Sequence, residues 1–323
     1  CFVWCFLHYY DTQKIAWLAG ASLAIGALIL EKPIVLYSIP FFALWIVMWQ
    51  WTCIPWRTLT AHAFLFMMLA SMGAGIWSWR NHRVLDTWEL GTGGVILLRR
   101  ASQVDFTTPE IISMGLSFAV GDYLGAKLYD GFPRDENGFP DEPKTWDPAI
   151  EQRLKETKFY GKNGHHDWII TDLDGETLTR VSFDRKLKEE AIAKIREKPI
   201  KFFLVGFLNL FRLNAPVNLG SQETMHLFAG NDELSPAAKT FGVIAIRGAW
   251  YAFLALVFYG VMRKRKHWRT AGLLAFMMIY YNGMYAFFSH AEVRYVLTVM
   301  PFYFIFLTIG TMSLYETYST RRT

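Results

Sequence analysis

The sequence predicts an all-α polytopic membrane protein, with one polar block set between two groups of apolar segments. Of its 323 residues, 53% are hydrophobic, 17% are aromatic and 19% are charged, and the mean hydropathy is +0.18. Soluble chains carry about 25% charged residues, spread more evenly along the sequence. Here the charges concentrate in residues 99–201. This contrast between segments indicates a chain that crosses a bilayer several times.

Several stretches approach the length of about 20 apolar residues that a helix needs to cross the hydrocarbon core. They are residues 15–30, 34–51, 58–79, 240–262, 270–288 and 296–314. The first two are short and are joined by Glu31-Lys32-Pro33, which predicts a tight helical hairpin or a partly re-entrant pair. Trp and Tyr residues gather near the ends of the stretches, as they do at membrane interfaces.

Basic residues in the short connections predict the orientation of these segments. Residues 263–269 form the densest basic cluster, and Arg321-Arg322 follow the last apolar stretch. By the positive-inside rule both belong on the cytoplasmic side, so residues from about 80 to 239 are expected to be extracytoplasmic. The predicted parts are transmembrane helices (1–98), an extracytoplasmic insert with an amphipathic helix (99–200), an interfacial helix with an outer loop (201–239) and C-terminal transmembrane helices (240–323).

Gly, Pro and Asp clusters in the insert predict a small α+β elaboration, with strands over residues 168–171 and 177–182. Residues 184–198 predict a charged amphipathic helix that is capped by Asp184 and stopped by Pro199. Its apolar stripe consists of Phe183, Leu187, Ala191 and Ile195.

Residues 201–213 are apolar but too short to span a bilayer. Lys201, Asn209 and Arg212 fall near one face of a helix formed by this segment. We therefore expect the helix to lie in the outer interface of the membrane.

The sequence offers little sign of a nucleic-acid, metal or cofactor site. It contains no basic stripe of the kind that nucleic-acid binding requires. The three cysteines, Cys1, Cys5 and Cys53, show no metal or disulfide spacing. Asp172-Leu173-Asp174 precedes a glycine and predicts a hairpin turn, and His165-His166-Asp167 predicts a solvated loop. We expect neither a metal nor a cofactor.

Polar and ionisable residues gather at the predicted outer ends of the spans, where such residues usually serve a function. They are Lys32, Arg80, Asn81, His290, Glu292, Arg294 and Tyr295. Arginine binds phosphate in bidentate fashion, so the cluster predicts a site for an anionic lipid head group. The alternative for Lys32 is an ordinary interfacial anchor, and Arg247 is expected to snorkel out of its span.

Five elements, taken in order, resemble GT-C membrane glycosyltransferases, a class that includes protein O-mannosyltransferases and the aminoarabinose transferases of lipid A. They are Leu18-Ala19-Gly20 with Gly26 and Glu31-Lys32-Pro33; Ile76-Trp77-Ser78-Trp79-Arg80-Asn81; Gly93-Gly94; residues 191–199 with 202–213; and Glu292-Val293-Arg294-Tyr295 with Pro301. The resemblance covers most of the chain outside residues 103–184. Ser78 and Thr298 depart from the family pattern, and these departures weaken the alignments of Arg80 and of the last helix.

The resemblance implies a GT-C-like helical bundle in a bacterial cytoplasmic membrane. Its activity would be transfer of a sugar from a polyprenyl-phosphate donor to a lipid, glycan or protein acceptor. Lys32, Arg80 and Arg294 would hold the donor phosphate, and Glu292, Tyr295, His290 and Asn81 would position it. The family's catalytic carboxylate lies in the first outer loop, after the first helix. Because Cys1 falls inside an apolar run, we read the chain as a fragment, expect the base upstream and expect the fragment alone to be inactive.

A second class of function stays open from the residues alone. The chain could be a non-catalytic multi-pass protein, either a transporter or a scaffold for envelope polysaccharide assembly. A transporter should place charges near the bilayer midplane and show broken helices in two related halves, and the sequence shows neither pattern.

Overall fold

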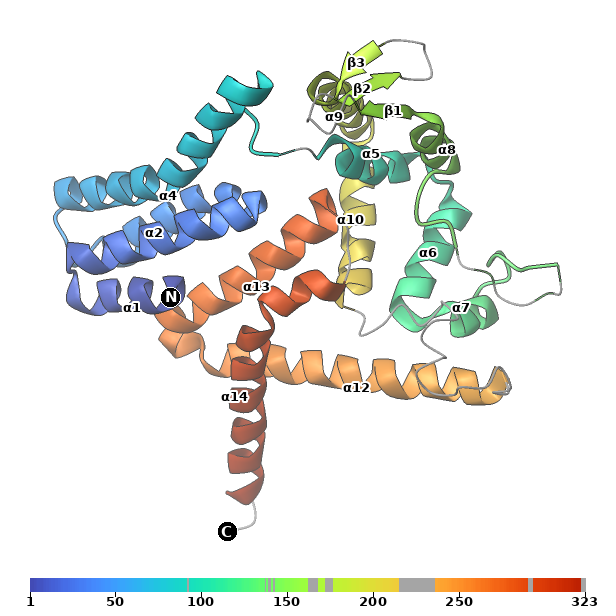
Figure 1. The fold of residues 1–323 in the computed structure, drawn as a ribbon. Helices are drawn as coiled ribbons and strands as arrows, with labels where there is room; N and C mark the ends of the chain where they lie inside the picture. The colour runs from blue at the N-terminus through green and yellow to red at the C-terminus, as the bar shows by residue number, and fades with distance from the viewer. Residues whose placement is uncertain are drawn as a thin grey trace. The chain divides into compact units, whose positions relative to one another are not determined.

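A computed structural model of the chain describes residues 1–91, 93–136, 138, 141, 143–161, 168–171, 177–214, 236–289 and 293–320. Helices dominate these residues, with one small sheet (Figure 1). The chain divides into two compact units. The first contains Cys1–Thr92 and His267–Leu274, and the second contains Gly93–Lys266 and Ala275–Thr323. The prediction of a mainly α-helical protein is confirmed.

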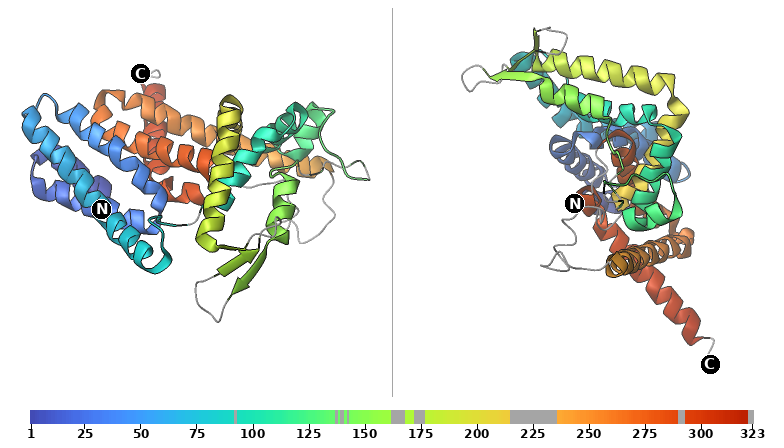
Figure 2. Two further views of the ribbon diagram at one scale, coloured as in Figure 1. Left: turned by 90° about the horizontal axis from the view of Figure 1, so that it is seen from above. Right: turned by 90° about the vertical axis from the view of Figure 1, so that its right-hand side faces the viewer.

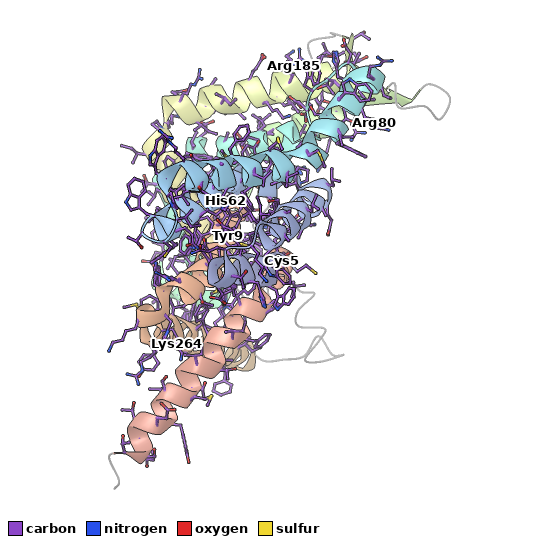
Figure 3. The ribbon with its side chains drawn as sticks, turned by 90° about the vertical axis from the view of Figure 1, so that its left-hand side faces the viewer. Cys5, Tyr9, His62, Arg80, Arg185 and Lys264 are labelled. Carbon is purple, nitrogen blue, oxygen red and sulfur yellow. The ribbon has the colours of Figure 1, made fainter. Side chains whose placement is uncertain are left out.

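The first unit packs four helices through aromatic and small side chains. They are α1 (Phe2–Thr12), α2 (Ile15–Glu31), α3 (Ile39–Gln50) and α4 (Trp56–Leu85), with the 3-10 turn η1 (Pro33–Ser38) between α2 and α3. The rings of Phe6, Phe42 and Phe66 meet edge to face and are fully buried. The Tyr9 hydroxyl lies 2.8 Å from Nδ1 of His62, and Figure 3 labels both residues.

The second unit begins with the polar block. Its elements are α5 (Gly94–Ser102), η2 (Gln103–Asp105), α6 (Thr108–Val120), α7 (Asp122–Leu128), α8 (Pro148–Glu156), β1 (Lys158–Gly161), β2 (Trp168–Thr171), β3 (Thr177–Thr179), α9 (Arg180–Glu197) and α10 (Pro199–Asn214). The three strands form an antiparallel sheet in the order β1-β2-β3, with Gly161 paired to Trp168 and Thr171 to Thr177. The predicted small α+β elaboration is present in this block.

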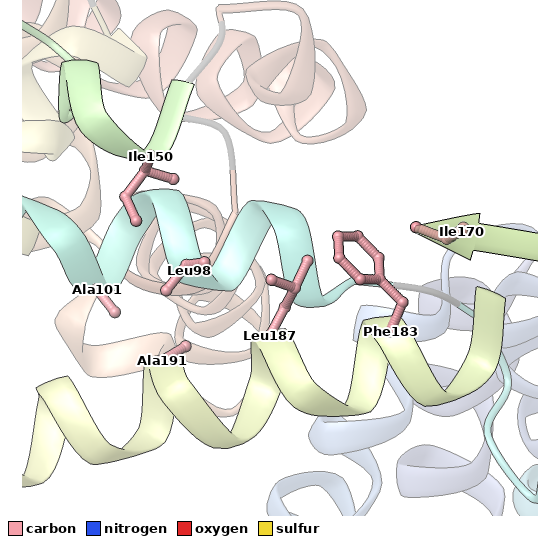
Figure 4. Packing of buried hydrophobic residues seen from close by; sticks show 7 residues of the cluster. All are labelled: Leu98, Ala101, Ile150, Ile170, Phe183, Leu187 and Ala191. Atoms are coloured by element: carbon pink, nitrogen blue, oxygen red, sulfur yellow. The ribbon is translucent and has the colours of Figure 1, made fainter. Parts of the chain in front are cut away.

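The core of the block confirms the predicted apolar stripe. Phe183, Leu187 and Ala191 of α9 are buried, and Ile195 packs at the edge of the same cluster. The cluster also draws residues from α5, α8 and β2, as Figure 4 shows: Leu98, Ala101, Ile150 and Ile170. The stripe therefore holds the helices and the sheet together.

The start of α9 differs from the prediction. Thr179 caps the helix, because its hydroxyl oxygen accepts the backbone N–H of Ser182, and β3 ends at the same residue. Asp184 therefore lies inside α9 and is not its N-cap. Its carboxylate instead accepts the backbone N–H groups of Gly93 and Gly94 at 3.1 and 2.7 Å. Asp184 thus caps α5, about ninety positions earlier in the sequence.

The predicted polar face of α10 points into the protein. Lys201 donates to the Phe106 carbonyl oxygen, Asn209 donates to the Gln103 side-chain oxygen, and Arg212 lies over the Phe118 ring. The opposite face is apolar and exposed, with Ile200, Phe203, Leu204, Phe207 and Phe211. Proline at position 199 disfavours helical dihedrals at Lys198, so the chain turns sharply between α9 and α10 (Figure 2).

The C-terminal part of the second unit consists of α12 (Pro236–Arg263), η3 (Arg265–His267), most of α13 (Trp268–Phe288), η4 (Val293–Thr298) and α14 (Met300–Ser319). Four described helices are long and apolar enough to cross a membrane: Pro33–Gln50, Trp56–Leu85, Ile244–Arg263 and Trp268–Phe288. These helices indicate a membrane-embedded protein.

The segment 15–30, which the sequence predicts to be short, forms α2, a shorter apolar helix. One predicted span is revised by the structure. The segment 296–314 is not one continuous helix, because η4 ends at Thr298 and α14 begins at Met300 with Pro301 in its first turn. Proline lacks an N–H and starts a new helix more readily than it continues one. The polar residues near the C-terminal end of α14 also lower the mean hydropathy of this helix.

Glycines allow α12 and α14 to approach each other closely. A Cβ atom built at Gly260 would overlap the Phe306 carbonyl oxygen, and one built at Gly310 would overlap the Leu256 carbonyl oxygen. Small residues at such crossings let helix backbones touch, which favours helix association inside a bilayer.

Gly260→Ala is therefore expected to destabilise the second unit by about 1–3 kcal/mol through overpacking. Gly248→Ala, in the same helix, is the matched control, because a Cβ atom there meets nothing within 4 Å. Melting temperatures of the protein in detergent compare the two variants. Equal melting temperatures would contradict the close crossing at Gly260.

Candidate functional site

Lys32 and Arg80 lie toward the same end of the first unit. Gly26 of α2 packs on the Ala70 backbone of α4, and Leu30 packs on Gly73 a turn further along both helices. The two helices therefore run in the same direction. Lys32 immediately follows α2 and Arg80 lies in the last turns of α4, near the end labelled in Figure 3.

Arg80 is exposed and is held by its neighbours. Its Nη1 donates to Oδ1 of Asn81 at 3.0 Å, and its guanidinium lies 5.0 Å from the centre of the Trp77 ring. Asn81 is only 5% exposed and donates from Nδ2 to the Glu89 carbonyl oxygen at 2.8 Å. Asn81 therefore anchors the segment after α4 and orients the Arg80 side chain.

The remaining predicted site residues belong to the second unit. His290 and Glu292 lie outside the described residues, as do both discounted motifs, Asp172-Leu173-Asp174 and His165-His166-Asp167. The backbone of Arg294 lies in η4, but its side chain is not described. Tyr295 stacks flat on Tyr285 of α13, with ring centres 4.2 Å apart. The meeting of Lys32, Arg80 and Arg294 at one site stays a prediction.

Arg247 does not snorkel as expected. Its side chain is buried and donates from Nη1 to the Phe118 carbonyl oxygen, while the Tyr251 hydroxyl donates to the Ala119 carbonyl oxygen at 2.6 Å. Both carbonyls belong to the last turn of α6, where helix carbonyls lack backbone donors. A cation at this position also interacts favourably with the helix dipole.

The structure also reveals a cluster of arginines that sequence reasoning missed. Arg99 and Arg100 are adjacent in α5 but face different surroundings. Arg99 forms a bidentate ion pair with Glu151, at 2.6 and 2.8 Å. Arg100 is only 2% exposed, and it donates from Nε to the Ser289 carbonyl oxygen and from Nη1 to the Gln103 side-chain oxygen.

A single tryptophan joins Arg100 to a second arginine. The centre of the Trp146 ring lies 5.3 Å from Cζ of Arg100 and 5.4 Å from Cζ of Arg212. Burial, together with the positive charge of Arg212, lowers the pKa of Arg100 to about 9. That pKa still lies above neutral pH, so Arg100 stays protonated there. We call Arg100, Trp146 and Arg212 the arginine–tryptophan cluster.

Arginine side chains supply positive charge and N–H donors, which are the groups that bind anions in proteins. In the part of the chain that the structure describes, no group of three or more His, Cys, Asp or Glu side chains could hold a metal ion. No protein family model, no curated protein and no solved structure matches this chain significantly. The long apolar helices define the class of this chain, which is a helical, membrane-embedded protein. Its polar block buries Arg100.

The cap formed by Asp184 positions α5, the helix that carries Arg100. Asp184→Ala is expected to destabilise the protein by about 1–2 kcal/mol, because two backbone N–H groups lose their acceptor. Glu189→Ala, an exposed position of the same helix, is the control. Thermal melting in detergent measures the difference. An unchanged melting temperature in Asp184→Ala would argue against this cap.

Proposed function

We propose that the chain belongs to the GT-C membrane glycosyltransferases and uses a polyprenyl-phosphate sugar donor on the extracytoplasmic face. The observation that carries the proposal is the placement of Lys32 and Arg80 at the same end of two apolar helices. A phosphate attached to a lipid chain lies at the boundary between hydrocarbon and water. Cations that end apolar helices can reach a phosphate at that depth.

The surroundings of Arg80 support a role in phosphate binding. Its hydrogen bond to Asn81 uses Nη1, so Nε and Nη2 can donate to two phosphate oxygens. Trp77 is 46% exposed beside it, which gives an isoprenoid tail or a sugar face a surface to pack on. The buried amide of Asn81 limits the freedom of the guanidinium and thereby lowers the entropic cost of binding.

The proposed mechanism needs cations that stabilise the leaving phosphate and a base that deprotonates the acceptor hydroxyl. The bond between the sugar and the donor phosphate breaks, and negative charge grows on the leaving phosphate. Lys32, Arg80 and Arg294 stabilise that charge. A carboxylate removes the proton from the acceptor hydroxyl as it attacks the sugar. The proposal assigns donor binding to the residues of this chain and does not assign the base to any of them.

Substitution of the proposed phosphate ligands tests the function directly. Arg80→Ala and Arg294→Ala are each expected to weaken binding of a short-chain prenyl-phosphate sugar by about tenfold or more, because each removes a charge-assisted hydrogen bond. Arg83→Ala is the matched control, since Arg83 is an exposed arginine of the same helix beside Trp79. Binding is measured by calorimetry in nanodiscs. Equal binding by all three variants would remove these arginines from the site.

Accessibility labelling tests whether the proposed ligands share one membrane face. Lys32→Cys, Arg80→Cys and Arg294→Cys, each placed in a chain that lacks Cys1, Cys5 and Cys53, should react with an impermeant maleimide in intact cells. Lys264→Cys, in the basic cluster, should react only after permeabilisation. Labelling of Lys32, Arg80 and Arg294 from opposite sides would rule out a shared phosphate site.

A further inference from the structure

Helix α10 directs its polar side chains toward the protein and its apolar side chains outward. Asn209 and Arg212 on the polar face contact η2 and α6. The outward face is strongly exposed, at 85% for Ile200 and 46–58% for Phe203, Leu204, Phe207 and Phe211. A helix that lies flat in a membrane interface needs the opposite arrangement, because its polar face must meet water. The covered polar face of α10 therefore excludes the flat, interfacial position expected from the sequence.

The composition of the outward face matches the hydrocarbon layer of a membrane. Its side chains are Phe, Leu and Ile, which carry no polar atom. Trp and Tyr favour the boundary between hydrocarbon and head groups, and neither occurs in α10. Before the sharp turn at Pro199, α9 exposes charged residues such as Glu189 and Arg196. A boundary between water and hydrocarbon at this turn suits both helices.

Contacts with α13 indicate the direction that α10 takes. The part of α13 in the second unit belongs to a helix long and apolar enough to cross a membrane. The Phe202 ring lies 6.0 Å from the ring of Phe288, the last residue of α13, and the Phe207 ring lies 5.4 Å from the Phe287 ring. A Cβ atom built at Gly206 would overlap the Phe287 ring. Thus α10 begins beside the C-terminal end of α13.

The C-terminal end of α10 contacts α13 again, closer to the middle of that helix. Asn214 donates from Nδ2 to Oδ1 of Asn282 at 2.8 Å, and Asn282 donates from Nδ2 to the Tyr303 hydroxyl at 2.9 Å. The Tyr303 hydroxyl donates to Oδ1 of Asn214 at 3.0 Å, which closes a ring between α10, α13 and α14. Asn282 precedes the last residue of α13 by six positions, or about 9 Å along the helix axis. The end of α10 therefore lies deeper along α13 than its start does.

The same asparagine supplies a donor to the backbone at the end of α10. Asn214 donates from Nδ2 to the Leu210 carbonyl oxygen at 3.0 Å. The last carbonyls of a helix lack backbone donors, and inside a bilayer water cannot replace them. A side-chain donor at this position is what a helix that ends within the hydrocarbon layer requires.

We propose that α10 is a re-entrant helix whose outward face binds the hydrocarbon chains of the bilayer. It enters the bilayer at Pro199, from the side on which the polar block lies, and ends beside α13 and α14 without crossing. Its 16 residues span about 24 Å, which is less than the hydrocarbon thickness of about 30 Å. This inference does not depend on the sugar-transfer proposal.

Spin labels on the outward face test the proposal. Phe203→Cys, Phe207→Cys and Phe211→Cys are each placed in the full chain without its three native cysteines, labelled, and reconstituted into phosphatidylcholine vesicles. Collision rates are measured with oxygen, which concentrates in hydrocarbon, and with a nickel chelate, which stays in water. We expect the ratio of oxygen to nickel collisions to rise from Phe203 to Phe211, because the helix goes deeper along this direction.

Ile192→Cys is the matched control, because Ile192 is an apolar residue of α9 that is 41% exposed and precedes the turn. Its ratio of oxygen to nickel collisions should be several-fold lower than the ratio at Phe211. Leu204→Cys, on the same face of α10, replaces any label site whose variant does not fold, as judged by size-exclusion chromatography.

Four results would overturn the proposal. Equal ratios at the three sites would mean that α10 lies flat in the interface. Frequent nickel collisions at all three would place the face in water. Rare collisions with both reagents would mean that a protein surface covers the face. A ratio at Ile192 as high as that at Phe211 would show that the bilayer boundary does not lie at Pro199.

Discussion

The apolar surface that the helices leave uncovered is the constraint on which the rest of the structure depends. In the 18-residue apolar stretch of α4, only 28% is buried inside the protein, and in the corresponding stretch of α12 only 17% is buried. Apolar faces of this extent would drive aggregation in water, so they require a bilayer or another apolar partner. In a bilayer, charged side chains are restricted to helix ends, the polar block and the protein interior.

This constraint explains why several polar side chains point inward. In α10, Lys201 contacts Phe106, Asn209 contacts η2, and Arg212 contacts α6 and Trp146, while the exposed face is apolar. In α12, Arg247 supplies a donor to a carbonyl at the end of α6. Backbone groups away from water must find partners within the protein, and long basic side chains reach them from neighbouring helices.

Long-range contacts also decide where the arginines of the polar block lie. Asp184 fixes the start of α5, and the cluster that joins Leu98 to Leu187 fixes its packing against α9. One consequence is that Arg99 reaches Glu151 while Arg100 enters the interior. A one-residue shift of α5 would exchange their surroundings, because adjacent side chains on a helix point about 100° apart.

The sequence by itself determined the features that depend on local pattern. Apolar length predicted α2, α3, α4, α12 and α13, the turn residues of the polar block predicted the strand β2, and the spacing of Phe183, Leu187, Ala191 and Ile195 predicted the buried stripe. Only the tertiary structure decided the cap made by Asp184, the break before α14, the burial of Arg247 and the arginine–tryptophan cluster. Each of these depends on contacts between residues far apart in the sequence or on competition between neighbouring elements. Periodicity and spacing carry no information about such partners.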